Sequence, residues 1–86
     1  MSAPAQVLRA EFTVFPFRES QVLPDHARAA VDAARASGAA VEVGPLSNVI
    51  AGEVRVVLEG LLAATLAAFE AGATRVAVNL ELEARP

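Results

Sequence analysis

The sequence predicts one α+β domain with the element order β-α-β-β-α-β. Three observations support this prediction. Apolar and polar residues alternate near both ends of the chain, at 7–17 and 74–83, as they do in strands with one buried face. Two alanine-rich segments, 24–37 and 53–71, repeat apolar residues at helical spacing. Between them, 39–43 and 48–51 are short apolar runs separated by Gly44-Pro45, which is typical of a hairpin.

The first strand ends at a proline, and the first helix begins at one. In 7–17, alternate residues form an apolar set, Leu8, Ala10, Phe12 and Val14, and Pro16 ends the strand. Residues 18–23 form a loop. Pro24 suits the first helical turn, where its missing N–H costs nothing. Gly38 is a natural left-handed stop for a helix over 24–37.

The second half of the chain repeats this plan after the hairpin. Gly52 is expected to break the strand at 48–51, and a helix over 53–71 follows it. Gly60 lies inside this helix at some cost in helix propensity, which suggests close contact with the sheet or the other helix. Gly72 ends the helix. In the last strand an apolar set alternates with polar residues: Val76, Val78, Leu80 and Leu82.

Two helical crossovers around a central hairpin give the ferredoxin-like sandwich, a four-stranded antiparallel sheet with both helices on one face. We expect the first and last strands side by side in the middle of the sheet, with their apolar sets pointing at the helices. The other face is then open to a ligand or a second subunit. It carries Glu11, Thr13, Phe15, Glu42, Asn79 and Glu81, with Asn48 and Ile50 as candidate additions.

Length and composition narrow the functional classes. Eighty-six residues make a single domain over 1–86, with a flexible tail at 1–6. The chain is 55% hydrophobic but only 5% aromatic, and so much apolar surface on a short chain suggests a homo-oligomer. A net charge of −3 without a basic cluster argues against nucleic acid. The absence of cysteine excludes disulfides and thiolate metal sites. Without a signal peptide or a membrane-length apolar stretch, we expect a cytoplasmic protein.

Nothing in the sequence predicts catalysis or a metal site. His26 is the single histidine; it lies in the first turn of a predicted helix, and we interpret it as solvated. The serines have no evident general base, and the glycines match neither a P-loop nor a dinucleotide-binding pattern. Acylphosphatases share the predicted fold, but the segment RESQVLP after the first strand lacks the glycines of their phosphate-cradling loop. We therefore predict that the protein is not an enzyme.

The candidate binding residues are polar or aromatic side chains near the open face. Glu11 and Glu81 would repel each other across paired strands unless a cation or an arginine lies between them. Asparagine is unfavourable in strands, yet its amide can bind the edge of a heterocycle. Each residue also has an ordinary structural interpretation: solubility, hairpin-turn chemistry or a subunit contact. The full set is Glu11, Thr13, Phe15, Ser47, Asn48, Asn79 and Glu81.

Taken together, several motifs resemble the small thiamine-binding family of YkoF-like proteins, which bind thiamine or its hydroxymethylpyrimidine part. They are AEFTVFPF, a helix ending in Ser-Gly, VGPLSNVIAGE, a long helix and GATRVAVNLELE, and the similarity spans about residues 8–83. Pro45 and Gly52 match the family pattern. Asn48 stands where the pattern has threonine, and Ala51 where many relatives have an acidic residue.

The resemblance implies a non-catalytic protein that binds thiamine or a related pyrimidine at the open sheet face or at a subunit interface, with no other cofactor. Phe15 would stack on the ligand or contact its cation, Glu11 or Glu81 would balance the thiazolium charge, and Thr13, Asn48 and Asn79 would bind the pyrimidine edge. It also implies assembly into homodimers or homotetramers through the sheets. The alternative is an oligomeric structural or regulatory module of the same fold without a thiamine site.

Overall fold

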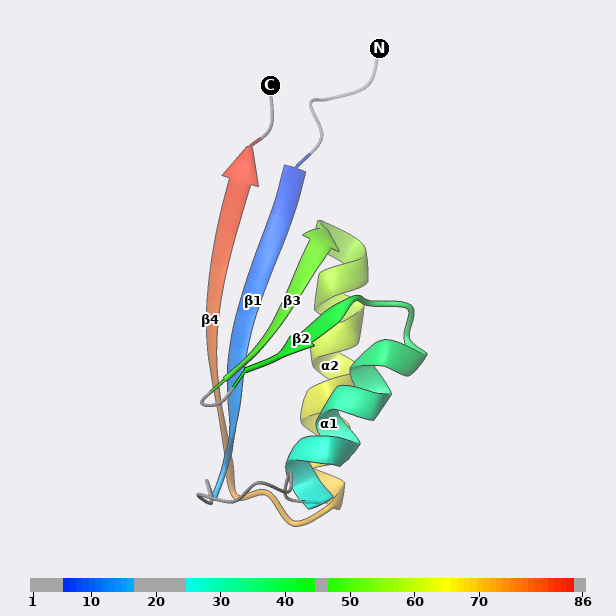
Figure 1. Ribbon diagram of the computed structural model, residues 1–86, viewed down its shortest axis with the longest axis vertical. Coiled ribbons are helices and arrows are strands. Elements are labelled where there is room, and N and C mark those ends of the chain that lie inside the picture. Colours follow the sequence, from blue (N-terminus) through cyan, green and yellow to red (C-terminus); the bar gives the residue numbers. More distant parts are fainter. Residues whose placement is uncertain (1–5, 17–24, 45–46, 85–86) are drawn as a thin grey trace.

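The computed structural model has the element order that the sequence predicts, and it describes residues 6–16, 25–44 and 47–84. The elements are β1 (Gln6–Phe15), α1 (Asp25–Ala36), β2 (Val41–Val43), β3 (Asn48–Glu53), α2 (Val54–Glu70) and β4 (Arg75–Ala84). Both helices lie on one side of the sheet (Figure 1). The predicted ferredoxin-like α+β fold is therefore confirmed. Of the tail predicted at 1–6, residues 1–5 lie outside the described residues, whereas Gln6 is the first residue of β1 and pairs with Ala84. The loop at 18–23, Phe17, Pro24 and Pro45 also lie outside the described residues.

The sheet is fully antiparallel, with the strand order β2-β3-β1-β4. β1 pairs with β4 along its whole length, from Gln6 opposite Ala84 to Phe15 opposite Arg75. The first and last strands are thus neighbours, as predicted. However, the expectation that both lie in the middle of the sheet is wrong, because β1 and β3 are the inner strands and β4 is an edge.

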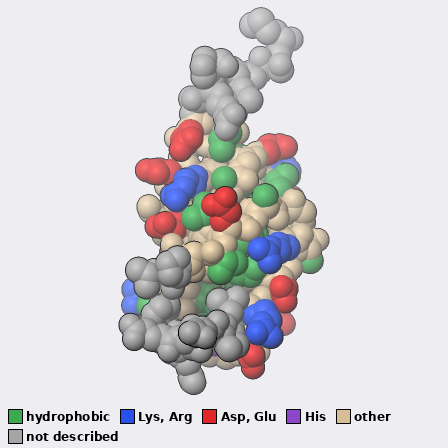
Figure 2. Space-filling model, viewed as in Figure 1, with side chains coloured by type: hydrophobic (Ala, Val, Ile, Leu, Met, Phe, Trp, Pro, Cys, Tyr) green, Lys and Arg blue, Asp and Glu red, His purple; other side chains and the backbone are tan. Residues whose placement is uncertain are grey.

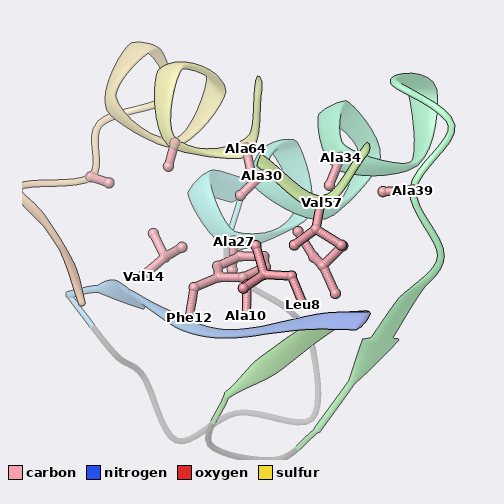
Figure 3. Packing of buried hydrophobic residues seen from close by; sticks show 13 residues of the cluster. Leu8, Ala10, Phe12, Val14, Ala27, Ala30, Ala34, Ala39, Val57 and Ala64 are labelled. Carbon is pink, nitrogen blue, oxygen red and sulfur yellow. The ribbon is translucent and has the colours of Figure 1, made fainter. Parts of the chain in front are cut away.

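The core lies between β1 and the helices. Strand alternation directs Leu8, Ala10, Phe12 and Val14 toward the helices, and all four are buried. Small side chains from both helices meet them (Figure 3), namely Ala27, Ala30 and Ala34 of α1 with Val57, Ala64 and Ala68 of α2. Because so many of these side chains are alanine, the helices and the sheet approach closely. The core is filled mostly by small, tightly packed side chains.

Gly60 lies where α2 meets the end of α1, as its position in the helix suggested. A Cβ at this position would lie 2.9 Å from the Cβ of Ala39 and 3.2 Å from Oγ of Ser37. The Ser37 hydroxyl is itself held in place, because it donates a hydrogen bond to the carbonyl of Ala34 at 2.6 Å. There is no room for a side chain at Gly60.

The prediction that Gly52 breaks the third strand is wrong. β3 continues through Gly52 to Glu53, and α2 begins at the next residue, Val54. Gly52 has φ of +151°, which an L side chain rarely adopts, so the glycine is needed to turn the chain from strand into helix without a loop. Gly38 and Gly72 follow the two helices with positive φ, as predicted.

The apolar set of β4 faces the helix side of the sheet but is not covered. The register places Val78 opposite Phe12, Leu80 opposite Ala10 and Leu82 opposite Leu8, so these side chains share the face of the core residues. Nevertheless Val78, Leu80 and Leu82 are 43–56% exposed. α2 packs mainly over β1 and β3, and α1 over β1 and β2, which leaves β4 at the edge away from both helices (Figure 1).

Charged side chains of both signs are scattered over the visible face of the molecule, with hydrophobic side chains exposed between them (Figure 2). Within the described residues, neither helix combines the length and hydrophobicity needed to span a bilayer.

Replacing Gly60 with alanine should destabilise the protein by about 1–3 kcal/mol, because the new methyl group overpacks the contact with Ala39. The loss should occur although alanine is favoured over glycine in a helix by about 1 kcal/mol. The free energy of unfolding from urea denaturation measures it. Glu59→Ala, at the preceding exposed position, is the control and should change stability by no more than about 0.5 kcal/mol. A Gly60→Ala variant as stable as the wild type would contradict the tight contact.

Candidate functional site

Five of the seven predicted site residues share the open face of the sheet. Glu11, Thr13 and Phe15 are alternate residues of β1, half-buried on the side opposite the core. The register sets Asn79 opposite Glu11 and Glu81 opposite Arg9, so both β4 residues lie on this face. Ala77 is opposite Thr13. The open face therefore brings a carboxylate, an amide and an aromatic ring together, as predicted.

Arginines already contact the charged and aromatic groups of this face. Arg9 Nη2 lies 3.8 Å from Glu11 Oε2, and the two side chains are 39% and 41% exposed. A pair this open to solvent contributes little to stability. The guanidinium carbon of Arg75 lies 4.7 Å from the ring centroid of Phe15, within the range of a cation–π contact. A cationic ligand on this face would compete with both arginines.

Asn48 lies on the other side of the sheet, which corrects the suggestion that it and Ile50 join the open face. The register sets Asn48 opposite Phe12 and Ile50 opposite Ala10, two core residues. Ile50 is fully buried, and Asn48 is only 6% exposed. Because a strand alternates its faces, no ligand can contact Asn48 and the Glu11 face of the same chain at once.

The carboxamide oxygen of Asn48 is buried and has no hydrogen-bond partner. A buried acceptor without a partner costs about 1–3 kcal/mol, and such groups are rare enough that each one needs an explanation. Solvent is nevertheless close: Val43 of β2 pairs with Asn48 on the same face and is 46% exposed. Asn48 is thus a polar group facing the core, one strand from the surface.

Ser47 contributes to the hairpin through its backbone. Its carbonyl oxygen accepts a hydrogen bond of 2.8 Å from the Gly44 N–H, which closes the turn. The side chain is half-buried at the start of β3. The two residues before it, 45–46, lie outside the described residues. A hairpin turn therefore explains the position of Ser47, whose backbone closes it. It does not explain why Asn48 is buried with an unpaired oxygen.

His26 is buried, not solvated as expected. It is 8% exposed, and its Nε2 lies 2.8 Å from the carbonyl oxygen of Pro16. An N–H at Nε2 would donate to this carbonyl and join the start of α1 to the end of β1. The sequence did carry a signal for burial, because His26 lies four residues before Ala30 and eight before Ala34, on the buried stripe of α1.

A groove of about 640 Å³ opens at the start of α2. It contains none of the predicted site residues. Its lining combines charged and apolar side chains: Gln6, Glu53, Val54, Arg55, Leu58, Glu59 and Leu62. Among the described residues, no three or more His, Asp or Glu side chains are grouped to hold a metal ion.

Comparison with known proteins finds a family model and solved structures that match this chain. A family model described as thiamine-binding protein matches residues 10–86. The chain is similar to a domain of unknown function, DUF77, from Bacillus cereus, with 27% identity, a TM-score of 0.68, and coverage of 95% of this chain and 79% of the other. It also shares its fold with a Thermotoga maritima protein proposed to act in thiamine biosynthesis or salvage, with 19% identity, a TM-score of 0.62, and coverage of 90% and 82%. Comparison with curated proteins gives no match.

Replacing Asn48 with leucine, which has nearly the same shape, should stabilise the unliganded protein by about 1–3 kcal/mol, because it removes a buried acceptor without a partner. For a domain of this size, the melting temperature should rise by at least about 4 °C. The control is Asn79→Leu, the same substitution on the exposed opposite face, which should change stability by no more than about 0.5 kcal/mol. A destabilised Asn48→Leu variant would mean that the amide is satisfied in the free protein.

Proposed function

The chain belongs to the thiamine-binding protein family, and on that premise we propose that it binds thiamine, or a related aminopyrimidine such as hydroxymethylpyrimidine, without transforming it. The fold it shares with a thiamine biosynthesis or salvage protein agrees with this proposal. The observation that carries the proposal within this chain is the buried oxygen of Asn48 without a partner.

The chemistry of an aminopyrimidine fits this oxygen. The exocyclic amine of the ring is a hydrogen-bond donor, and the ring nitrogens are acceptors. A carboxamide offers both an acceptor and two donors, so it can pair with the edge of such a ring. A hydrogen bond from the amine to Oδ1 would offset the 1–3 kcal/mol or so that the unpaired acceptor costs in the free protein. The ring would enter past the exposed Val43.

The open sheet face is the second candidate location for the same ligand. Glu11 and Asn79 lie opposite each other there and could face the thiazolium charge and the pyrimidine edge. These groups are half-buried or exposed, so water satisfies them without a ligand. Arg9 also balances the charge of Glu11 in part. For these reasons we favour the Asn48 side.

A structural or regulatory module without a thiamine site is the alternative function. The uncovered apolar residues of β4 favour a role in assembly. One measurement distinguishes this alternative from the main proposal, because only the main proposal requires the folded protein to bind a pyrimidine.

Isothermal titration calorimetry with thiamine and with hydroxymethylpyrimidine should give saturable heat at millimolar ligand or below. Comparable affinities for the two would show that the pyrimidine supplies most of the binding energy. Thiazole alone is the matched control and should bind at least tenfold more weakly. If neither pyrimidine gives heat at millimolar concentration while circular dichroism shows a folded protein, the proposed function is wrong.

Three variants should then locate the site. Asn48→Leu should weaken binding about 5- to 150-fold, since the loss of a buried hydrogen bond worth about 1–3 kcal/mol raises the dissociation constant by that factor. Asn79→Leu and Glu11→Gln, on the open face, should bind as the wild type does. The reverse pattern, with Asn48→Leu unaffected and Glu11→Gln impaired, would move the ligand to the open face.

A further inference from the structure

Two arginines of α1 lie on the side of the helix that faces β2. Arg35 Nη2 donates a hydrogen bond of 3.2 Å to the carbonyl oxygen of Val41, so its side chain reaches the edge strand of the sheet. Arg28 precedes Arg35 by seven residues, nearly two full turns, and therefore lies on the same side of the helix, about 10 Å away along its axis. Both arginines are exposed. They place two positive charges along the border between α1 and β2, which lie side by side (Figure 1).

The acidic residue between these arginines points in another direction. The buried side of α1 is formed by His26, Ala27, Ala30, Val31 and Ala34. At 100° per residue, Arg28 and Arg35 lie about 110–130° from the centre of this side, at its border. Asp32 lies about 170° from the same centre, on the side of the helix opposite the core. Its carboxylate is therefore turned to solvent, whereas the two arginines flank the sheet.

Asn48 lies level with the part of α1 between the two arginines. The helix begins beside the end of β1, where His26 Nε2 lies 2.8 Å from the carbonyl oxygen of Pro16. It ends beside Val41, to which Arg35 is bonded. Asn48 pairs with Val43, two residues farther along β2 toward the start of the helix. The unpaired oxygen of Asn48 is thus reached from the surface by passing between α1 and the exposed side chain of Val43.

The sheet supplies no charge that would cancel the arginines at this entrance. Apart from Asn48, the helix-side residues of β2 and β3 are uncharged: Val41, Val43, Ile50 and Gly52. Glu42 pairs with Val49, which in turn pairs with Glu11, so the Glu42 carboxylate is on the open face. Within the described residues, a group that enters past Val43 therefore passes between positive charges.

We propose that the Asn48 site takes an aminopyrimidine that carries a phosphate monoester, with the ring amine on Asn48 Oδ1 and the phosphate bound by Arg28 and Arg35. The inference rests on the proposed function, because it uses the same buried oxygen. In hydroxymethylpyrimidine, the hydroxymethyl group is on the ring carbon next to the one that bears the amine. A ring whose amine is at Asn48 can therefore direct the phosphate ester of this group toward the arginines.

The guanidinium groups suit this role. A guanidinium has five N–H donors in a planar fork that matches a phosphate, and the bond from Arg35 to Val41 uses one of them. In thiamine, the cationic thiazolium replaces the hydroxyl of the same hydroxymethyl group, which would bring a positive charge to the arginines. The charges at the entrance thus favour the phosphate ester over the free alcohol, and the alcohol over thiamine.

Isothermal titration calorimetry of the full chain with hydroxymethylpyrimidine and with its phosphate ester tests the inference. The ester should bind about tenfold more tightly at low salt, as expected for two arginine–phosphate contacts open to solvent. This advantage should largely disappear at about 0.5 M sodium chloride, where such contacts are screened. Inorganic phosphate alone should bind at least about tenfold more weakly than the ester, because it lacks the ring that reaches Asn48.

Arginine variants should separate recognition of the phosphate from recognition of the ring. Arg28→Gln and Arg35→Gln should each reduce the preference for the ester about threefold, and the double variant should abolish it, with unchanged affinity for hydroxymethylpyrimidine. Arg55→Gln is the matched control, an exposed arginine at the start of α2, and it should keep the preference. Circular dichroism checks that each variant is folded.

The outcomes distinguish a failure of this inference from a failure of the proposed function. If the wild type binds the alcohol but shows no preference for the ester, the inference is overturned and the proposed function remains. A preference that survives the double substitution also overturns it, as does inorganic phosphate that binds as tightly as the ester. If neither pyrimidine gives heat, the proposed function is wrong and the inference fails with it.

Discussion

The double pairing of β1 is the constraint on which the rest of the structure depends. This strand has β3 on one side and β4 on the other, so its register fixes the face of every residue in its neighbours. Its even-numbered residues, Leu8 to Val14, form the floor of the core, and its odd-numbered residues form the open face. A slip of one residue would exchange the two faces. The positions of Asn48, Asn79 and Leu80 therefore follow from pairing with β1.

The placement of the helices then decides which strands remain uncovered. Helices that meet through small residues pack at the short end of the usual range of about 8–10 Å, and the Gly60 contact is an extreme case. Here they lie over β1, β2 and β3, and β4 is left out. This placement leaves Val78, Leu80 and Leu82 exposed.

Periodicity was enough to predict the element order and the two faces of β1 and β4, because alternation is a local property of the chain. What it could not predict depended on tertiary placement. Asparagine at the start of a strand suggests an outward turn residue, yet pairing with Phe12 turns Asn48 inward. Gly52 suggests the end of a strand, but a glycine is equally needed where a strand runs directly into a helix. A histidine in the first turn of a helix suggests exposure to solvent. In the fold, however, its ring lies beside the carbonyl oxygen of Pro16. Whether the apolar side chains of β4 are covered depends on where the helices pack, which no local pattern encodes.

Asn48 and the apolar residues of β4 both depart from what is usual in a monomeric domain. Asn48 buries an acceptor without a partner, and Val78, Leu80 and Leu82 are exposed apolar side chains. Both lie on the helix side of the sheet, but at different edges. Asn48 is in β3 beside the edge strand β2, and β1 separates it from β4. Any contact along β4 would therefore leave the route past Val43 to Asn48 open. A ligand at Asn48 and a contact along β4 would thus not compete for the same surface.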